Sequence, residues 1–166
     1  SLYVRGIPFV DLVHLRKTDV KHNTIYYYRH KTRQQLSVHI ESYAAQIINR
    51  YKNEAASSPY LLLILSLTGE DGYRQYKSAL RLYNQHLHTL SKMLRLSIPL
   101  TSYVARHSWA TTAKDEGVAI SVISESLGHT SEKVTHVYLA SFDNNAMSKA
   151  NKKVIATIHP NKKKKP

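Results

Sequence analysis

Apolar and polar residues alternate over one part of the chain, and this pattern predicts strands there. Residues 24–30 are rich in Tyr and β-branched side chains, and within residues 36–40 apolar positions alternate with Ser37 and His39. A period of two is typical of a β-strand with one buried face. The polar segment 31–35 between the two runs lacks the Asn-Gly pair of a two-residue turn. We therefore expect a β-hairpin closed by a longer loop.

Over the rest of the chain, apolar residues recur at spacings of three and four, which predicts amphipathic helices. The longest helix is expected from Asp71, as its N-terminal cap, to Leu94, ahead of Pro99, with a Tyr and Leu stripe that faces the core. Gly128 is expected to end another helix as a C-terminal cap. The other helices are expected at residues 8–15, 42–51, 105–116, 120–127 and 131–138, with a last amphipathic segment at 144–158.

Length and composition narrow the class of protein. The chain has 166 residues, of which 42% are hydrophobic, and this is enough for one compact domain with a single core. It contains no Cys, which excludes disulfides, thiolate nucleophiles and thiolate metal sites. Its longest apolar run, residues 61–65, is far shorter than the roughly 20 residues that cross a bilayer. No signal peptide is visible. Because the first residue is Ser1 rather than Met, we expect a fragment with a domain missing upstream.

The charge balance points to a polyanionic partner. The chain has 24 Lys and Arg against 11 Asp and Glu, a formal net charge of +13. Six of these charges are lysines within residues 152–165, so 13 less 6 leaves +7 on the remainder. Nucleic acid and an acidic membrane surface are the two candidate partners. The membrane is the weaker candidate, since the expected long helix has no strongly basic face.

Three short segments place an arginine, a histidine and a tyrosine in a fixed order. They are Arg106-His107-Ser108-Trp109, Leu127-Gly128-His129 and, nine residues after that histidine, Tyr138. Each segment alone is ordinary: a solvated arginine, a helix cap followed by a surface histidine, and one tyrosine among twelve. As a set they resemble the tyrosine recombinase (phage integrase) family, over residues 3–151. The amino-acid sequences of residues 5–11 and 103–109 resemble those of the branch that includes integrases of conjugative transposons.

The resemblance implies a mixed α/β fold, mostly helical with a small antiparallel sheet, for a catalytic domain over residues 1–158. Residues 159–166 are expected to form a basic, disordered tail. The N-terminal core-binding domain that the family usually carries is expected to be absent from this chain. The phosphotyrosine chemistry of the family needs neither metal nor ATP, so no cofactor is expected. Ten His are present, but no His-Glu-x-x-His pattern occurs.

The resemblance assigns catalytic roles to four residues. Tyr138 would attack a phosphodiester, hold the 3′-phosphate covalently and release a 5′-hydroxyl; since free tyrosine has a pKa of about 10, a base or a positive field must help it ionise. Arg106 matches the family's second arginine, a planar and permanently charged clamp for the transition state. His129 matches a histidine that binds a phosphate oxygen or assists proton transfer. Lys31, in the hairpin turn, matches the general acid toward the 5′-oxygen; its alternative is an ordinary phosphate contact.

Two positions depart from the family pattern. Where the family usually has a His three residues before the second arginine, this chain has Tyr103, which can donate a hydrogen bond to phosphate but carries no charge. The adjacent His107 is expected to have a packing role. Strict alignment puts the first arginine at Pro8, and we expect Arg5, about 4.5 Å earlier along a helix axis, to replace it as a catalytic residue. The alternative is that Arg5 contacts only the DNA backbone and the catalytic arginine is absent or replaced.

The remaining implied residues support the site or bind DNA. Asp11 would support the catalytic residues without contacting DNA. Arg29 and Arg33 would contact the DNA backbone from the hairpin. The partners implied are double-stranded DNA at attachment sites and, on DNA, three further copies in a homotetramer, with a monomer possible for the isolated domain. Residues 144–158 would pass between neighbouring copies or pack within their own chain. No membrane partner is implied, and the expected location is the bacterial cytoplasm, in association with DNA.

Several functions are compatible with these residues. The leading interpretation is a recombinase that integrates or excises a mobile element. An invertase or a resolvase of the same family stays open, as does a non-catalytic DNA-binding module descended from a recombinase. A type IB topoisomerase would share the chemistry, but the Leu-Gly-His and Arg-His-Ser-Trp segments favour recombinases.

Overall fold

The Tyr-rich hairpin and one short preceding strand form a three-stranded antiparallel sheet. In the computed structural model, which describes residues 1–140, the strands are β1 (Val20–Lys21), β2 (Thr24–Tyr28) and β3 (Gln35–His39), in the order β1-β2-β3. Ile25 pairs with Val38 and Tyr27 pairs with Leu36. These four side chains are buried while their neighbours along each strand are exposed, so the expected period of two is confirmed. The short β1 was not predicted, because two residues carry no period.

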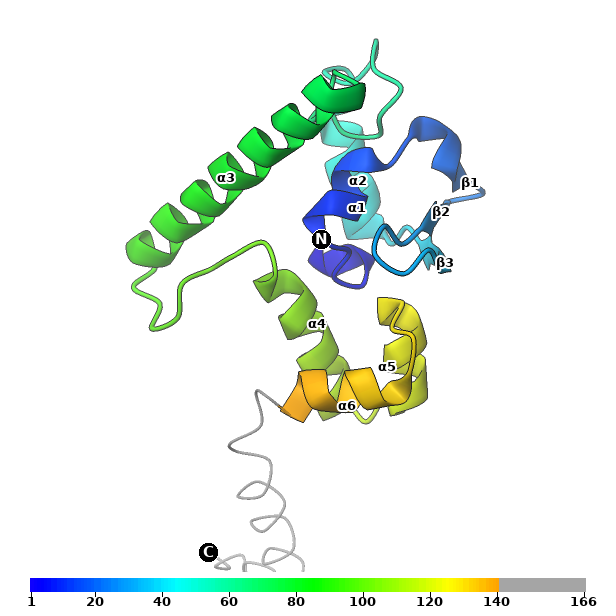
Figure 1. The fold of residues 1–166 in the computed structure, drawn as a ribbon, viewed down its shortest axis with the longest axis vertical. Coiled ribbons are helices and arrows are strands. Elements are labelled where there is room, and N and C mark those ends of the chain that lie inside the picture. The colour runs from blue at the N-terminus through cyan, green and yellow to red at the C-terminus, as the bar shows by residue number, and fades with distance from the viewer. Residues whose placement is uncertain (141–166) are drawn as a thin grey trace, which may run out of the picture.

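The rest of the described chain is mostly helical, as expected. Two short 3-10 helices flank the first α-helix, and the α-helices follow in chain order (Figure 1). Their bounds are η1 Leu2–Val4, α1 Phe9–His14, η2 Lys17–Asp19, α2 Ser42–Arg50, α3 Gly69–Met93, α4 Val104–Asp115, α5 Ile120–Leu127 and α6 Glu132–Ala140. The bounds of α5 are those predicted, and Gly128 caps it in the left-handed conformation. The predicted segments 144–158 and 159–166 lie outside the described residues.

The long helix α3 differs from the prediction at both ends. Thr68 is its N-terminal cap, and Asp71 lies in its first turn. It ends at Met93, well before Pro99, so proline does not terminate it. The apolar stripe faces the core only as far as Tyr83, which stacks on Phe9 with ring centroids 4.9 Å apart. The remainder of the helix extends away from the other elements (Figure 1), and its last apolar side chains are exposed.

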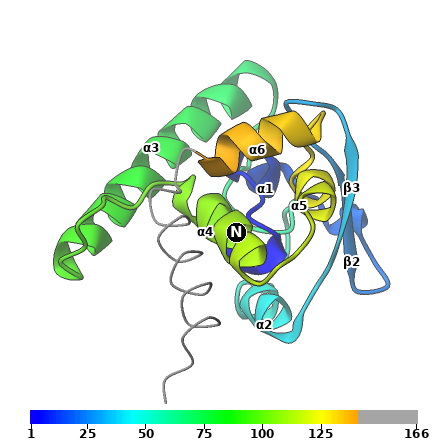
Figure 2. The ribbon, with the colours of Figure 1, turned by 90° about the horizontal axis from the view of Figure 1, so that it is seen from below.

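Three clusters of buried side chains hold the elements together. The first joins the inner face of the sheet to η1 and α2, the second packs α1 against α3 as far as Tyr83, and the third lies between α4, α5 and α6. Figure 2 shows α5 between α4 and the sheet. The C-terminal end of α5 therefore lies where the hairpin and the C-terminal helices meet.

The connection from η1 to α1 crosses the backbone of α4 at very short range. Gly6 has φ +64°, and a Cβ atom at this position would lie 2.5 Å from Cα of Arg106. Only glycine is compatible with both the left-handed conformation and the close approach. This contact positions the N-terminal segment against the helix that carries Arg106.

We predict that Gly6→Ala destabilises the fold much more than Gly117→Ala. Gly117 has φ +80°, but nothing lies within 4 Å of the point that a Cβ atom would occupy there. Gly117→Ala should therefore lower the free energy of unfolding only by the cost of the left-handed conformation, about 1–2 kcal/mol. Alanine at position 6 adds a clash with the backbone, so Gly6→Ala should lower the free energy of unfolding by about 3 kcal/mol or more. Urea unfolding of both variants measures the difference. Equal losses would mean that the crossing can widen freely.

Candidate active site

Arg106 is buried at the centre of a polar cluster between α4 and the end of α5. Its side chain is 2% exposed. Nη1 donates to the carbonyl oxygen of Gly6 at 3.4 Å, and Nη2 donates to the carbonyl oxygen of Leu127 and lies 3.4 Å from Nε2 of His129. Within residues 1–140 no carboxylate pairs with this guanidinium. A buried charge without a counter-charge is unfavourable, so the cluster favours an anion.

His129 reaches the cluster because α5 stops one residue before Gly128 turns the chain. Gly128, at φ +64°, reverses its direction, and the ring of His129 then lies between Arg106 and α6. Since Arg106 can only donate, Nε2 of His129 must accept. Nδ1 therefore carries the proton and donates to Oγ1 of Thr135 at 2.8 Å. Burial, helped by Arg106, Arg29 and Lys31, lowers the pKa of His129 to about 4. The imidazole is neutral at neutral pH, with a lone pair inside the cluster.

Tyr138, on α6, lies against two histidine rings. It stacks on His107 with centroids 4.6 Å apart and meets the edge of His129 at 5.5 Å. The ring of Tyr103 lies 5.4 Å from that of His107, so it borders the same group, although its side chain is 45% exposed. Burial raises the pKa of Tyr138 to about 12, against the opposing effect of Arg106. The phenol is therefore protonated at neutral pH and needs a base to become a nucleophile.

The end of β2 brings a second arginine to the cluster. Arg29 is 5% exposed, and its Nη1 lies 2.8 Å from Oδ2 of the buried Asp11. Its Nε donates to the carbonyl oxygen of Leu127 at 3.3 Å, the same atom that Arg106 contacts. The other carboxylate oxygen of Asp11 accepts from the backbone N–H of His30 at 2.8 Å. Asp11 thus fastens the hairpin to α1, and Arg29 lies inside the site rather than on the exposed hairpin.

The hairpin loop lies beside the same group of residues. Oγ1 of Thr32 donates to the carbonyl oxygen of Gly128 at 3.2 Å, which fixes the loop to the end of α5. The exposed Lys31 contributes to the lowered pKa of His129, so its charge acts on the cluster. Arg33, at φ +59°, is exposed in the same loop.

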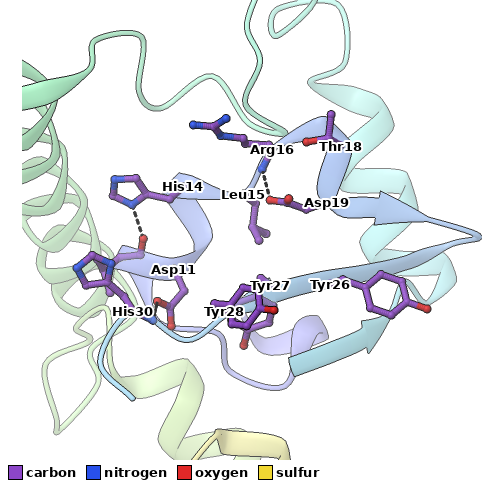
Figure 3. A pocket seen from close by; sticks show the side chains of 11 residues that line it. Asp11, His14, Leu15, Arg16, Thr18, Asp19, Tyr26, Tyr27, Tyr28 and His30 are labelled. Carbon is purple, nitrogen blue, oxygen red and sulfur yellow. Dashed lines mark hydrogen bonds between the residues drawn. The ribbon is translucent and has the colours of Figure 1, made fainter. Parts of the chain in front are cut away.

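The cluster is distinct from the pocket beside α1. Asp11, Tyr27 and His30 line an open pocket between α1 and the sheet (Figure 3), but Arg106, His129 and Tyr138 do not. Among residues 1–140, no three His, Cys, Asp or Glu side chains are grouped so that they could hold a metal ion. In the same part of the chain no helix is both long and apolar enough to cross a membrane.

Comparison with known proteins identifies the family. Residues 2–145 match the model of the phage integrase family. The chain belongs to this family. Its members break and rejoin DNA, and the predicted family and fold are confirmed, whereas the branch is not decided by this match. No curated protein matches the chain by sequence.

Solved structures of recombinases share the integrase fold. XerA recombinase superposes with a TM-score of 0.66 at 20% identity, over 92% of this chain and 54% of that chain. XerH recombinase, solved on its palindromic difH substrate in a post-cleavage complex, gives 0.64 at 16%, over 90% and 42%. The Tn1549 transposon integrase, solved with transposon right end DNA, gives 0.62 at 14%, over 92% and 55%. The chain thus spans about half the length of these relatives.

Not every residue that the integrase resemblance assigned lies in the cluster. Tyr138, Arg106, His129, Tyr103, His107 and Arg29 are together, with Lys31 at their edge. Arg5 is elsewhere: it ends η1 at φ +54°, and its Nη1 donates to the carbonyl oxygen of Ser37 on β3 at 3.3 Å. Its side chain lines two pockets, each also lined by Trp109 and Val118, and no residue of the cluster lines either of them.

One residue of this cluster was not predicted from the sequence. Thr135 is fully buried and fixes the tautomer of His129 through its hydroxyl. It precedes Tyr138 by three residues, so the two share one face of α6. That spacing was the available signal, but a threonine three residues from a nucleophile is common in any helix.

We predict that His129→Gln flattens the dependence of stability on pH. The native pKa of His129 is about 4, and that of an unfolded histidine is about 6.5, so the unfolded chain binds more protons between these values. Stability should therefore fall as the pH is lowered through this window and then level off. His129→Gln should remove about 1–2 kcal/mol of that loss, less than the full shift because the ring is partly solvated.

Urea unfolding at pH 7, 5.5 and 4 measures this change. The matched control is His136→Gln, which makes the same substitution at an exposed position of α6 and should keep the wild-type slope. If the stability of His129→Gln depended on pH as steeply as that of wild type, folding would not keep His129 neutral.

Proposed function

We propose that the chain is the catalytic domain of a site-specific DNA recombinase, with Tyr138 as its nucleophile. The observation that carries the proposal is the convergence of three groups: a half-buried Tyr138, a neutral His129, and a buried Arg106 with no carboxylate partner in the described part of the chain. A phenol beside a base and an uncompensated guanidinium is what attack on a phosphodiester requires. A DNA-binding surface alone needs none of the three to be buried.

Each group then has a chemical role. Oη of Tyr138 attacks the phosphorus, the bond from phosphorus to the 5′-oxygen breaks, and the 3′-phosphate remains on the tyrosine. The phenolic proton passes to Nε2 of His129, directly or through one water. Arg106 donates to the nonbridging oxygens as their charge develops. Lys31 protonates the departing 5′-oxygen, so that a neutral hydroxyl leaves.

Arrival of the phosphate prepares the base for this step. In the free protein Nε2 of His129 accepts from Arg106. When Arg106 turns its donors to phosphate, that lone pair is released. The negative phosphate also raises the pKa of His129 from its low resting value, which makes it a stronger base only when substrate is bound. Tyr103 can donate a further neutral hydrogen bond to the phosphate, and the stacked ring of His107 holds the ring of Tyr138 in place.

The biological role follows from the relatives and the charge. The Tn1549 integrase and XerH are both solved on DNA that is their substrate or transposon end. We infer double-stranded attachment-site DNA as the partner, a homotetramer on DNA as the active assembly, and integration or excision of a mobile element as the reaction. The parts of a longer protein that match the other half of the relatives would complete the grip on DNA. Inversion of a DNA segment by the same chemistry is the alternative.

A non-catalytic DNA-binding module is the second candidate. The observation in its favour is Pro8 at the position where the family's first arginine aligns. The experiment on Tyr138 decides between the two candidates, because binding needs no phenol.

We predict that the full-length protein forms a covalent adduct with DNA that depends on Tyr138. The substrate is a pool of nicked duplexes with a randomised central segment, in which cleavage releases a short 5′-hydroxyl strand and traps the enzyme. Wild-type protein should yield adducts that survive denaturation, and Tyr138→Phe should yield none, since the phenyl ring has no nucleophile. Sequencing of the trapped strands identifies the preferred site.

Tyr28→Phe is the matched control, because Tyr28 is 65% exposed on β2 and should be cleavage-competent. No adduct from wild type across the pool would favour the non-catalytic module. An adduct that persists in Tyr138→Phe would assign the chemistry to another tyrosine.

We predict that Lys31→Ala is rescued by a better leaving group. On an ordinary duplex, loss of the general acid should slow cleavage by about 10²–10⁴-fold. When sulfur replaces the bridging 5′-oxygen, the thiolate departs without protonation, and Lys31→Ala should approach the wild-type rate. Arg33→Ala, two positions along the same loop, is the control and should show the same relative rate on both substrates. A Lys31→Ala defect of equal size on both substrates would reduce Lys31 to a phosphate contact.

A further inference from the structure

The family pattern has two arginines at the scissile phosphate, and Arg106 matches the second of them. Pro8 stands at the aligned position of the first arginine and has no charge. The guanidinium of Arg5 is engaged with the backbone of β3. The described residues nevertheless place a second buried guanidinium in the site, on the hairpin.

We propose that Arg29 is the second arginine that binds the scissile phosphate, in place of an arginine at position 8. This inference rests on the proposed function. It assigns to the end of β2 a role that the alignment assigns to the start of α1.

The first argument is the position of Asp11. It lies one helical turn after Pro8, so an arginine at position 8 would have this carboxylate as its neighbour. In this chain Arg29 occupies that carboxylate instead, at 2.8 Å, with both side chains buried. The guanidinium of Arg29 therefore occupies the place beside Asp11 that an arginine at position 8 would occupy, although Arg29 belongs to the hairpin and not to α1.

The second argument is the distance between the two arginines. Nε of Arg29 and Nη2 of Arg106 both donate to the carbonyl oxygen of Leu127. Two guanidiniums that share one acceptor atom are close enough to share one phosphate. Each repels the other, and Arg29 contributes to the lowered pKa of Arg106, after the effect of burial. A bridging anion would relieve that repulsion.

The third argument is the charge balance of the buried cluster. It holds two arginines and one carboxylate, Asp11, while His129 is neutral, so one positive charge is uncompensated within residues 1–140. A phosphodiester carries one negative charge. In the described part of the chain, Arg29 uses Nε and Nη1 for its hydrogen bonds, which leaves Nη2 for a phosphate oxygen.

The side chain of Arg29 is also held in place for this role. A Cβ atom at Gly128 would lie 3.3 Å from its Cδ and 3.6 Å from its Cγ, so the aliphatic stem packs on the glycine that ends α5. With the stem fixed there and Nη1 fixed by Asp11, the guanidinium is oriented before DNA arrives. Such preorganisation is what electrostatic stabilisation of a transition state requires.

The competing explanation is that the pair of Arg29 and Asp11 only fastens the hairpin to α1. A test must therefore separate charge at the phosphate from a folding role. Removal of Arg29 alone would leave Asp11 buried without its partner, so we use the double variant Asp11→Asn/Arg29→Met. Asparagine keeps the acceptor for the N–H of His30, and methionine keeps the apolar stem.

The decisive substrate is the trapped duplex with a methylphosphonate at the scissile position. Because this group carries no charge, it needs less cationic stabilisation. With an ordinary phosphate, the double variant should cleave about 10²–10³-fold more slowly than wild type; with the methylphosphonate it should cleave within about tenfold of wild type. The comparison variant is Arg5→Met, for which any defect should be equal on both substrates. An unrescued double variant, or rescue of Arg5→Met in its place, would overturn the proposal.

A second measurement separates this inference from the proposed function. Inorganic phosphate is titrated into ¹⁵N-labelled protein while the Nε–H signals of the arginines are followed by NMR. The signals of Arg29 and Arg106 should shift together with one dissociation constant, and the double variant should bind about tenfold more weakly. If wild type forms no DNA adduct but both signals shift, the anion site stands and the recombinase proposal fails. A shift of Arg106 alone would reject Arg29.

Discussion

The carbonyl oxygen of Leu127 is the atom around which the site is assembled. It belongs to the last turn of α5, where carbonyls have no partner within the helix and the helix dipole favours cations. Gly128 stops the helix there, and two arginines from distant segments, one directly after β2 and one on α4, supply the missing donors. One unsatisfied helix end thereby joins the hairpin to the C-terminal helices. The hydroxyl of Thr32 strengthens the same junction through the next carbonyl. The structural need of the helix and the chemical need of the site are met by the same guanidiniums.

Burial of Tyr138 and His129 beside these arginines sets the protonation of both side chains. Burial raises the pKa of Tyr138 to about 12 and lowers that of His129 to about 4, so the proposed nucleophile and its proposed base are both neutral before DNA binds. Transfer of the phenolic proton to the imidazole is therefore unfavourable while the site holds no anion. A bound phosphate would change this balance because it would pair with Arg106 and withdraw its donor from Nε2 of His129. In this arrangement the substrate itself completes the electrostatics of the site.

The sequence predicted the parts of this site that depend on local spacing. Arg106, His129 and Tyr138 each lie at a fixed offset within or just after one helix, so their order could be compared with the family pattern, and the structure brings the three together. The bounds of α5 were correct to the residue. The burial of Arg29 was not predictable in this way, because it depends on Asp11, 18 positions earlier and on another element. The same limit explains α3, where a uniform apolar stripe gave no sign that it meets Phe9 and its neighbours only as far as Tyr83. Patterns report which face is apolar, while tertiary contacts decide whether anything covers it.

A phosphate-binding site requires a positive charge at a defined position, but the arginine that supplies this charge can come from more than one element of the backbone. The arginine side chain is long enough for two different backbone origins to place a guanidinium at one carboxylate, and Asp11 defines that place here. A proline at position 8 fixes φ at −62° just before α1 begins, so it stabilises the helix start but gives up the charge. Supply of that charge from Arg29 transfers the task to a strand end that is already tied to α5 by the carbonyl of Leu127. Arg5 is then available to connect η1 with β3 through Ser37. The proline, the buried ion pair and the displaced Arg5 thus have a single physical explanation.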